Sequence, residues 1–148
     1  MKTKLLVLAF CLVSLTACHT PFDGPLAPGE NYYLGTVSVL YEGEYFNNED
    51  IKVLFSPEGD RASITLHRIR FVPKMPVKID VTIPDIQLQE GSDGVFTFSC
   101  TNVIPLALGG EYPRYTVTDL KGNVSEQHLS FSLNFGDYPT SFTGTLMQ

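Results

Sequence analysis

Apolar and polar side chains alternate along most of this chain with a period of two, which is the pattern of half-buried β-strands. The alternation is clearest at 77–83 and at 129–135. Less regular segments of the same kind occupy 33–41, 51–56, 62–71, 95–100, 115–119 and 142–147. After the apolar N-terminus, no segment keeps a helical period over three turns. The sequence therefore predicts an all-β domain of about eight strands.

Turn-forming residues and changes of phase divide these segments. Clusters of Gly, Pro, Asn and Asp predict turns at 57–60, 90–94, 121–123 and 136–139. The alternation slips at His67 and Arg68, since Ile69 and Phe71 have the opposite parity to Ile64, and this predicts a β-bulge or a break. Residues 104–112 are apolar, contain two adjacent glycines and lack a clear period. We expect a loop or an irregular strand there.

Eight short strands, each with one apolar face, must close on themselves or pack as two sheets. We expect an antiparallel up-and-down barrel, because most connections are short and suit hairpins better than long Greek-key crossings. Gly35 in the first strand and Gly144 in the last occupy positions where a sheet can bend sharply to close. A β-sandwich is the alternative.

The N-terminus has the organisation of a lipoprotein signal. Lys2 and Lys4 precede an apolar run over 5–15, which is too short for a stable transmembrane helix. Leu15-Thr16-Ala17-Cys18 then resembles the lipobox of bacterial lipoproteins, in which the chain is cut before the cysteine and the thiol acquires a diacylglycerol. We therefore predict that Cys18 is the lipid-attachment site, since two or three acyl chains anchor a protein durably. The alternative is an ordinary signal peptide with a chance cysteine.

Three parts follow from this interpretation. We predict a signal peptide at 1–17, the lipidated cysteine with a Pro/Gly-rich extended tether at 18–31, and one β-barrel domain at 32–148. Cys11 lies in the signal peptide and Cys18 carries lipid, so Cys100 is the one thiol left and no disulfide can form within the mature chain. We expect Cys100 to be a small buried apolar side chain.

The charge balance limits the choice of partners. The chain has a formal net charge of −6, and removal of the signal peptide with its two lysines makes it more acidic. An acidic chain argues against nucleic acid and against electrostatic attachment to anionic lipid headgroups. The predicted membrane contact is therefore the lipid anchor alone.

Catalytic and metal-binding patterns are missing from the sequence. His19, His67 and His128 lie far apart and lack a second ligand at a useful spacing, so we interpret them as surface histidines. Asp80 falls on the polar face of its strand with Lys78, and we interpret it as a surface charge. No nucleophile elbow, phosphate loop or carboxylate pair is present. We predict a protein that is not an enzyme and that holds no cofactor or metal.

The aromatic residues leave two functions open. The chain has ten Phe and seven Tyr, and the following occupy apolar strand faces: Phe96, Phe98, Phe131, Phe135 and Phe142. In a small barrel they either fill the interior or line a cavity for one small ligand. The first hypothesis is a binding module for a small apolar ligand, with ligand-binding residues unknown. The alternative is a structural or interaction lipoprotein whose solid-cored barrel docks onto other envelope components. Its candidate contact residues are Tyr32, Tyr33, Tyr112 and Tyr138.

Four stretches resemble a known family. They are Tyr-Leu-Gly-Thr-Val-Ser-Val at 33–39, Met-Pro-Val at 75–77, Tyr-Thr-Val-Thr-Asp-Leu-Lys-Gly at 115–122 and Phe-Thr-Gly-Thr at 142–145. In this order they resemble the calycin-like lipoproteins of gut Bacteroidetes over 32–147. The resemblance implies a lipocalin-like barrel in an outer-membrane lipoprotein of the cell envelope, facing the periplasm or the surface. It implies no ligand and no catalytic residues. Asp23 alone stands where some surface-displayed lipoproteins have an acidic cluster.

Overall fold

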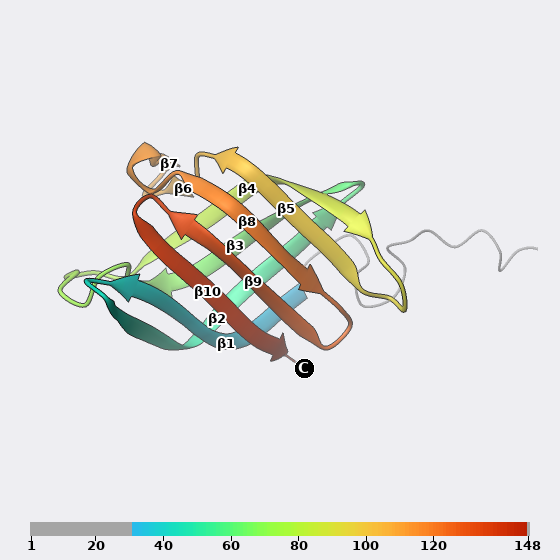
Figure 1. Cartoon of the computed structure of the whole chain (residues 1–148), viewed down its shortest axis with the longest axis horizontal. Coiled ribbons are helices and arrows are strands. Elements are labelled where there is room, and N and C mark those ends of the chain that lie inside the picture. The colour runs from blue at the N-terminus through green and yellow to red at the C-terminus, as the bar shows by residue number, and fades with distance from the viewer. Residues whose placement is uncertain (1–30, 148) are drawn as a thin grey trace, which may run out of the picture.

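The computed structural model describes residues 31–147, which form a closed antiparallel β-barrel (Figure 1). The wall consists of β1 (Asn31–Tyr41), β2 (Glu44–Glu58), β3 (Arg61–Ile69), β4 (Ile79–Glu90), β5 (Phe96–Val103), β8 (Val117–Val124), β9 (His128–Phe135) and β10 (Tyr138–Leu146). Two short strands, β6 (Leu106–Ala107) and β7 (Gly110–Glu111), precede a 3₁₀ turn at Pro113–Tyr115. The predicted all-β up-and-down barrel is confirmed. No helix within the described residues has the length and hydrophobicity needed to cross a bilayer.

The strand order follows the sequence around the barrel. The wall runs β3-β2-β1-β10-β9-β8-β5-β4, and pairing of β3 with β4 closes it. Gly35 pairs with Gly144 where the first strand meets the last. A Cβ atom at position 35 would collide with the Thr143 carbonyl, so only glycine permits this close approach. The two glycines therefore permit the close approach of the first and last strands, and the sharp bend expected at them stays a prediction.

The predicted bulge at His67 and Arg68 is also confirmed. The register between β3 and β4 shifts between Leu66 and Ile69, and Arg68 has a left-handed φ of 59°. The Arg68 backbone N–H donates a hydrogen bond to Asp80 Oδ1 at 2.8 Å. Asp80 therefore stabilises the bulge, which returns Ile69 to the interior.

Two predicted strand boundaries were wrong. β2 begins at Glu44 and includes the polar stretch before Ile51, where alternation is hidden by a buried asparagine. This residue, Asn48, donates to the Arg70 carbonyl at 3.1 Å and accepts from the Arg70 N–H at 2.9 Å. Val77 was expected on the buried face of the next strand, but it precedes β4 and is 58% exposed.

The predicted turn at 121–123 was wrong as well. These residues lie inside β8, and the chain reverses after Val124. Gly122 points inward, where an added Cβ would meet the Phe98 ring at 2.7 Å and collide with the Ser130 carbonyl. The ring of Phe98 therefore fills the space that a side chain at 122 would take. Residues 104–112, expected to be irregular, form the small β6–β7 hairpin.

Aromatic rings cross the interior at two levels. At one level the Phe55 ring on β2 lies 5.6 Å from that of Phe98 on β5, which is not a neighbouring strand. At the other level Phe71, just after β3, lies 4.9 Å from Phe135 on β9 and 4.0 Å from Tyr115. β3 and β9 lie on opposite sides of the barrel. Side chains from facing walls therefore touch, as they do in a packed core.

Candidate functional site

The barrel interior behaves as a core more than as a pocket. The contacts between Phe55 and Phe98 and between Phe71 and Phe135 join opposite walls, and all four rings are buried. Phe131 extends the first group, because its ring lies 6.2 Å from that of Phe98 and 5.4 Å from that of Phe142. A ligand inside the barrel would have to separate these rings.

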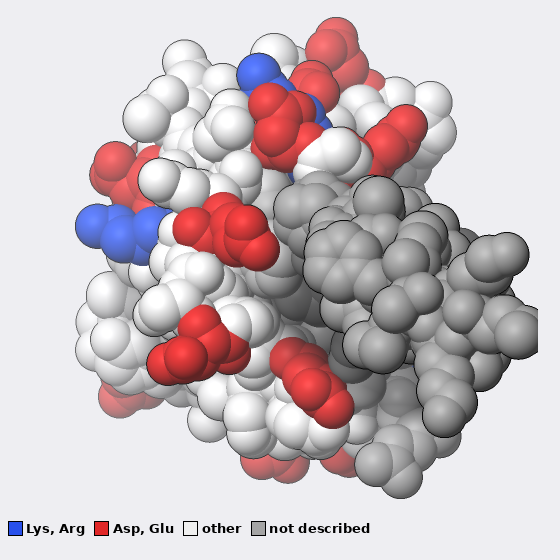
Figure 2. Space-filling view, turned by 90° about the vertical axis from the view of Figure 1, so that its right-hand side faces the viewer, with Lys and Arg blue, Asp and Glu red and all other residues white. Residues whose placement is uncertain are grey.

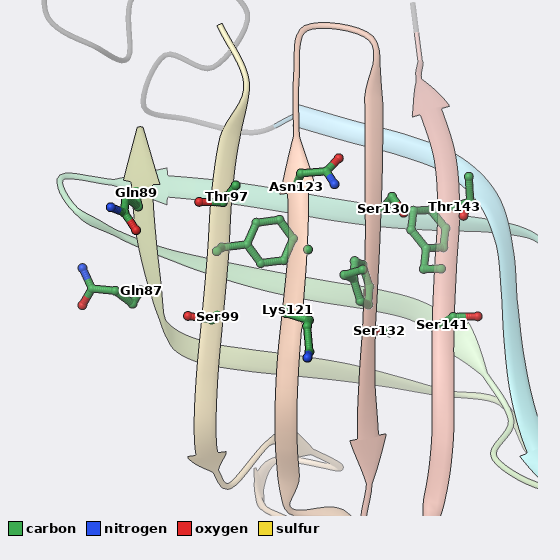
Figure 3. A pocket seen from close by; sticks show the side chains of 14 residues that line it. Gln87, Gln89, Thr97, Ser99, Lys121, Asn123, Ser130, Ser132, Ser141 and Thr143 are labelled. Atoms are coloured by element: carbon green, nitrogen blue, oxygen red, sulfur yellow. The ribbon is translucent and has the colours of Figure 1, made fainter. Parts of the chain in front are cut away.

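A hollow lies instead on the outer surface of the barrel (Figure 3). It has a volume of about 600 Å³ and extends over the end of β4 and over β5, β8, β9 and β10. Its outward-facing lining residues are Gln87, Gln89, Thr97, Ser99, Lys121, Asn123, Ser130, Ser132, Ser141 and Thr143. We call these ten residues the polar rows.

The strand register arranges these side chains in two rows. The first runs Gln89, Thr97, Asn123, Ser130, Thr143 from β4 to β10. The second runs Gln87, Ser99, Lys121, Ser132, Ser141 over the same five strands. Neighbouring strands lie about 4.8 Å apart, and residues two apart on one strand are separated by about 6.8 Å. The polar rows therefore present hydroxyl and amide groups at regular intervals.

The polar rows carry little charge in an acidic protein. The chain has 16 acidic residues, yet none of the ten side chains is acidic, and Lys121 is the one cation among them. Serine, threonine, asparagine and glutamine each offer both a donor and an acceptor. This surface can therefore form many hydrogen bonds with a neutral polar ligand.

A second hollow, of about 480 Å³, lies on the other side of the barrel and is strongly charged. Its lining residues are Tyr32, Glu49, Asp50, Ile51, Lys52, His67, Arg68, Lys78 and Asp80. His67 Nδ1 lies 3.4 Å from Asp80 Oδ2, and the His67 ring centroid lies 6.3 Å from that of Tyr32. A His–carboxylate pair supports catalysis when a nucleophile lies beside the imidazole. Asp80 already supports the bulge at Arg68, so we assign the pair a structural role.

Two other residues discussed from the sequence, His128 and Cys100, lie apart from both hollows. Cys18 and His19 fall outside the described residues, and His128 is exposed on β9. Cys100, expected to be a buried apolar side chain, is half-buried, and desolvation raises the pKa of its thiol to about 11, which disfavours the reactive thiolate. Among the described residues, no three His, Cys, Asp or Glu side chains form a group that could hold a metal ion.

The tyrosines differ from the predicted contact surface. Tyr33 is fully buried, so its assignment as a contact residue was wrong; its hydroxyl donates to the Ser125 carbonyl at 3.0 Å. Burial raises the pKa of Tyr33 to about 12. Tyr112 stacks on Tyr115 with ring centroids 5.1 Å apart. Tyr45, which is 71% exposed, was not singled out from the sequence.

The polar rows were not predicted, although part of their signal is in the sequence. Serine and asparagine occupy the outward positions of β9 after His128, and serine and threonine occupy those of β10 after Pro139. Their alignment across strands depends on register, and the register between β8 and β9 shifts between Thr118 and Lys121. Asp119 lies in this shift and has a left-handed φ of 51°, a backbone conformation that the sequence does not predict.

We compared the chain with protein-family models, curated proteins and solved structures. No family model, no curated protein and no solved structure matches the chain. The resemblance to calycin-like lipoproteins of gut Bacteroidetes stays a prediction from the four quoted stretches. The evidence for the closed eight-stranded barrel is the strand pairing in the structure.

Proposed function

We propose that this protein is a lipid-anchored lipoprotein of the bacterial cell envelope whose barrel binds a neutral glycan chain on its outer wall. The observation that carries the proposal is the pair of polar rows, which align hydroxyl and amide side chains across five strands with one charge among ten residues. In this view the barrel is a solid scaffold, and recognition takes place outside it.

The chemistry of the polar rows fits a polyhydroxylated polymer. A glycan hydroxyl is both a donor and an acceptor, so it pairs with Ser, Thr, Asn or Gln without a charged partner. The rows span five strands, or about 19 Å at the usual strand spacing. A linear chain laid across β4 to β10 would meet a hydrogen-bonding group at every strand. An anionic polymer would find only Lys121.

The lipid anchor is the second part of the proposal, and Cys18 lies outside the described residues. Its support is the Leu15-Thr16-Ala17-Cys18 stretch after a short apolar run. Expressed in a bacterial host, the full chain should partition into detergent and incorporate labelled palmitate. Cys18→Ala should remain soluble or unprocessed. A full chain that stays aqueous and unlabelled would disprove lipidation without affecting the glycan proposal.

A glycan array tests the binding site. The chain from residue 18 with Cys18→Ser, which removes the lipid, should bind neutral oligosaccharides in preference to anionic ones. Ser130→Asp places a carboxylate in the first row, where its cross-strand neighbours Asn123 and Thr143 are uncharged, and should weaken binding roughly tenfold or more, because the ligand would bury an unpaired charge. Ser63→Asp on β3, on the opposite side of the barrel, is the matched control and should bind like the parent chain.

Two results would contradict the binding proposal. One is the absence of binding to any neutral glycan by the folded parent chain. The other is equal binding by the parent chain and Ser130→Asp. A small apolar ligand inside the barrel, the first hypothesis from the sequence, stays a prediction; it requires that Phe55 and Phe98 separate. The alternative hypothesis, a barrel that docks onto an envelope protein, also assumes a solid core. It differs from our proposal in the partner, which is a protein and not a glycan.

A further inference from the structure

Tyr45 is an exposed aromatic residue beside the polar rows. It lies in β2 just after the turn of the β1–β2 hairpin, at the left of Figure 1, and it is 71% exposed. β1 separates β2 from β10, yet Tyr45 lines a hollow of about 280 Å³ together with Pro139 on β10 and Asn134 on β9. The Tyr45 side chain therefore reaches over β1 toward the strands of the polar rows. We call this hollow the aromatic hollow.

The aromatic hollow continues the larger hollow that the polar rows line. Ser132 and Ser141, which belong to the second row, contribute to both hollows. Asn134 and Pro139 lie two residues from them on β9 and β10 and pair with each other. Alternate residues of a strand project from the same face of the sheet. The aromatic hollow is therefore the next step along the same outer wall.

An apolar strip crosses the strands at this level. Tyr45 pairs with Leu40 on β1. Val39 pairs with Thr140, which places Leu40 beside Pro139 on β10. Tyr45 and Pro139 are exposed, and Leu40 is partly exposed. The polar rows thus border a strip of apolar side chains, and the outer wall is amphipathic here.

The charges around the aromatic hollow do not suit an anionic ligand. Asp119 and Lys121 line the hollow and have opposite signs. Glu44 adjoins Tyr45 in the sequence, Asp137 lies in the β9–β10 turn, and both are exposed. Figure 2 views the other end of the barrel, where β1 begins, and acidic side chains are spread over most of its described surface. A ligand on this wall lies between two ends that carry carboxylates, which favours a neutral ligand.

A glucose-type sugar ring matches an amphipathic surface of this kind. All of its ring hydroxyls are equatorial, so they project from the rim of the ring, and both faces carry only C–H groups. The face of an aromatic ring is electronegative and attracts C–H groups, and the ring offers a broad, rigid apolar contact. The rim hydroxyls pair with amide and hydroxyl side chains, and they donate to a carboxylate such as that of Asp119.

We propose that Tyr45 is the stacking surface for one ring of the bound glycan, and that the glycan is a chain of glucose-type pyranoses. This inference rests on the proposed function and narrows its ligand. The stacked ring lies on Tyr45 with its hydroxyls toward Asn134 and Asp119, and the chain continues past Ser132 and Ser141 onto the polar rows. Fructofuranose rings carry hydroxyl and hydroxymethyl groups on both faces, so they offer no flat C–H face to Tyr45.

Isothermal titration calorimetry with two neutral hexasaccharides tests the inference on the chain from residue 18 with Cys18→Ser. Cellohexaose is a linear chain of β-linked glucose, and an inulin-type hexasaccharide consists of fructofuranose. The parent chain should bind cellohexaose roughly fivefold tighter, because a furanose would bury polar groups against the Tyr45 ring. Tyr45→Ala should weaken cellohexaose binding roughly tenfold, whereas Tyr45→Phe, which retains an aromatic ring, should bind like the parent chain.

Proton NMR of the ligand gives a second readout, which reports the stacking itself. The ring C–H protons of bound cellohexaose should shift upfield, as protons over the face of an aromatic ring do. Tyr45→Phe should preserve these shifts and Tyr45→Ala should abolish them. Leu34→Ala is the matched control, because Leu34 is an exposed apolar residue of β1 that lines neither hollow. It should bind cellohexaose like the parent chain.

The outcomes separate this inference from the proposed function. Equal binding of cellohexaose by the parent chain and Tyr45→Ala overturns the role of Tyr45. Absence of cellohexaose binding by the folded parent chain, or equal or tighter binding of the fructofuranose hexasaccharide, overturns the ligand class. In each of these cases the proposed function survives if a neutral glycan binds and Ser130→Asp weakens that binding. If no neutral glycan binds, the inference and the proposed function both fail.

Discussion

The two sides of the barrel share one interior and differ outside. Across β5, β8, β9 and β10 the outward positions are small and nearly uncharged, whereas the hollow over the other strands contains Glu49, Lys52, His67 and Asp80. Both sides contribute the same kind of inward residue, an aromatic or aliphatic side chain that is buried. The inward positions thus determine stability, and the outward positions are free to differ for function.

The largest expected effect comes from an inward ring. Phe135→Ala removes a fully buried side chain that contacts Phe71 across the barrel, and it should lower the free energy of unfolding by about 3–5 kcal/mol. Ser132→Ala, outward on the same strand, should change it by less than about 0.5 kcal/mol. Urea unfolding measures both. Mild losses at Phe135, Phe131 and Phe98 alike would show that the interior holds an unfilled cavity.

Tyr33 offers a second way to separate inward from outward positions, through pH. Its folded-state pKa is about 12, against an ordinary value of 10.0, so the folded state keeps the phenol proton in a range where the unfolded chain loses it. Its stabilisation is complete below pH 10 and is lost as pH rises through 12, a fall of about 2–3 kcal/mol. Tyr33→Phe should lack this fall in unfolding free energy.

The control for this pH prediction is Tyr45→Phe. Tyr45 is 71% exposed, so its variant should show the same dependence of unfolding free energy on pH as the parent chain. Should Tyr33→Phe also follow the parent curve up to pH 12, the Tyr33 hydroxyl is not desolvated in the folded protein. Water would then compete with the Ser125 carbonyl for the hydrogen bond of the Tyr33 hydroxyl.

A smaller effect distinguishes two neighbours on β8. Gly122→Ala points a methyl group into the ring of Phe98 and the Ser130 carbonyl, and it should cost about 1–3 kcal/mol of unfolding free energy. Asn123→Ala changes an outward side chain on the same strand and should be nearly neutral. Thermal unfolding compares the two. A stabilising Gly122→Ala would mean that position 122 is open and that the ring does not cover it.

The barrel itself could be predicted because every second residue of a strand is apolar and faces the interior. Alternating apolar residues at 129–135 are buried as predicted, and the phase slip at His67 and Arg68 marks a real bulge. Burial of one face produces the same alternating apolar pattern in each strand, so this pattern can be recognised from the sequence alone.

The candidate site could not be predicted in the same way. Lys121-Gly122-Asn123 has the composition of a turn. Glycine stands inside the strand because an added Cβ would collide with the Ser130 carbonyl, Phe131 Cβ and the Phe98 ring, and the sequence does not show these contacts. The polar rows depend on how five strands align, which bulges such as that at Asp119 decide. Val77 continues an alternating pattern but lies before its strand, since no neighbouring strand pairs with it.

Backbone amide chemical-shift mapping by NMR tests most directly whether recognition occurs on the outer wall. The chain from residue 18 with Cys18→Ser would be titrated first with the neutral oligosaccharides that bind best and then, separately, with a fatty acid. We predict that oligosaccharide shifts the amides of Thr97, Asn123, Ser130 and Ser132, and that fatty acid leaves Phe55, Phe98 and Phe135 unchanged. Saturable fatty-acid shifts at those three inward residues, without oligosaccharide shifts on the polar rows, would contradict the account.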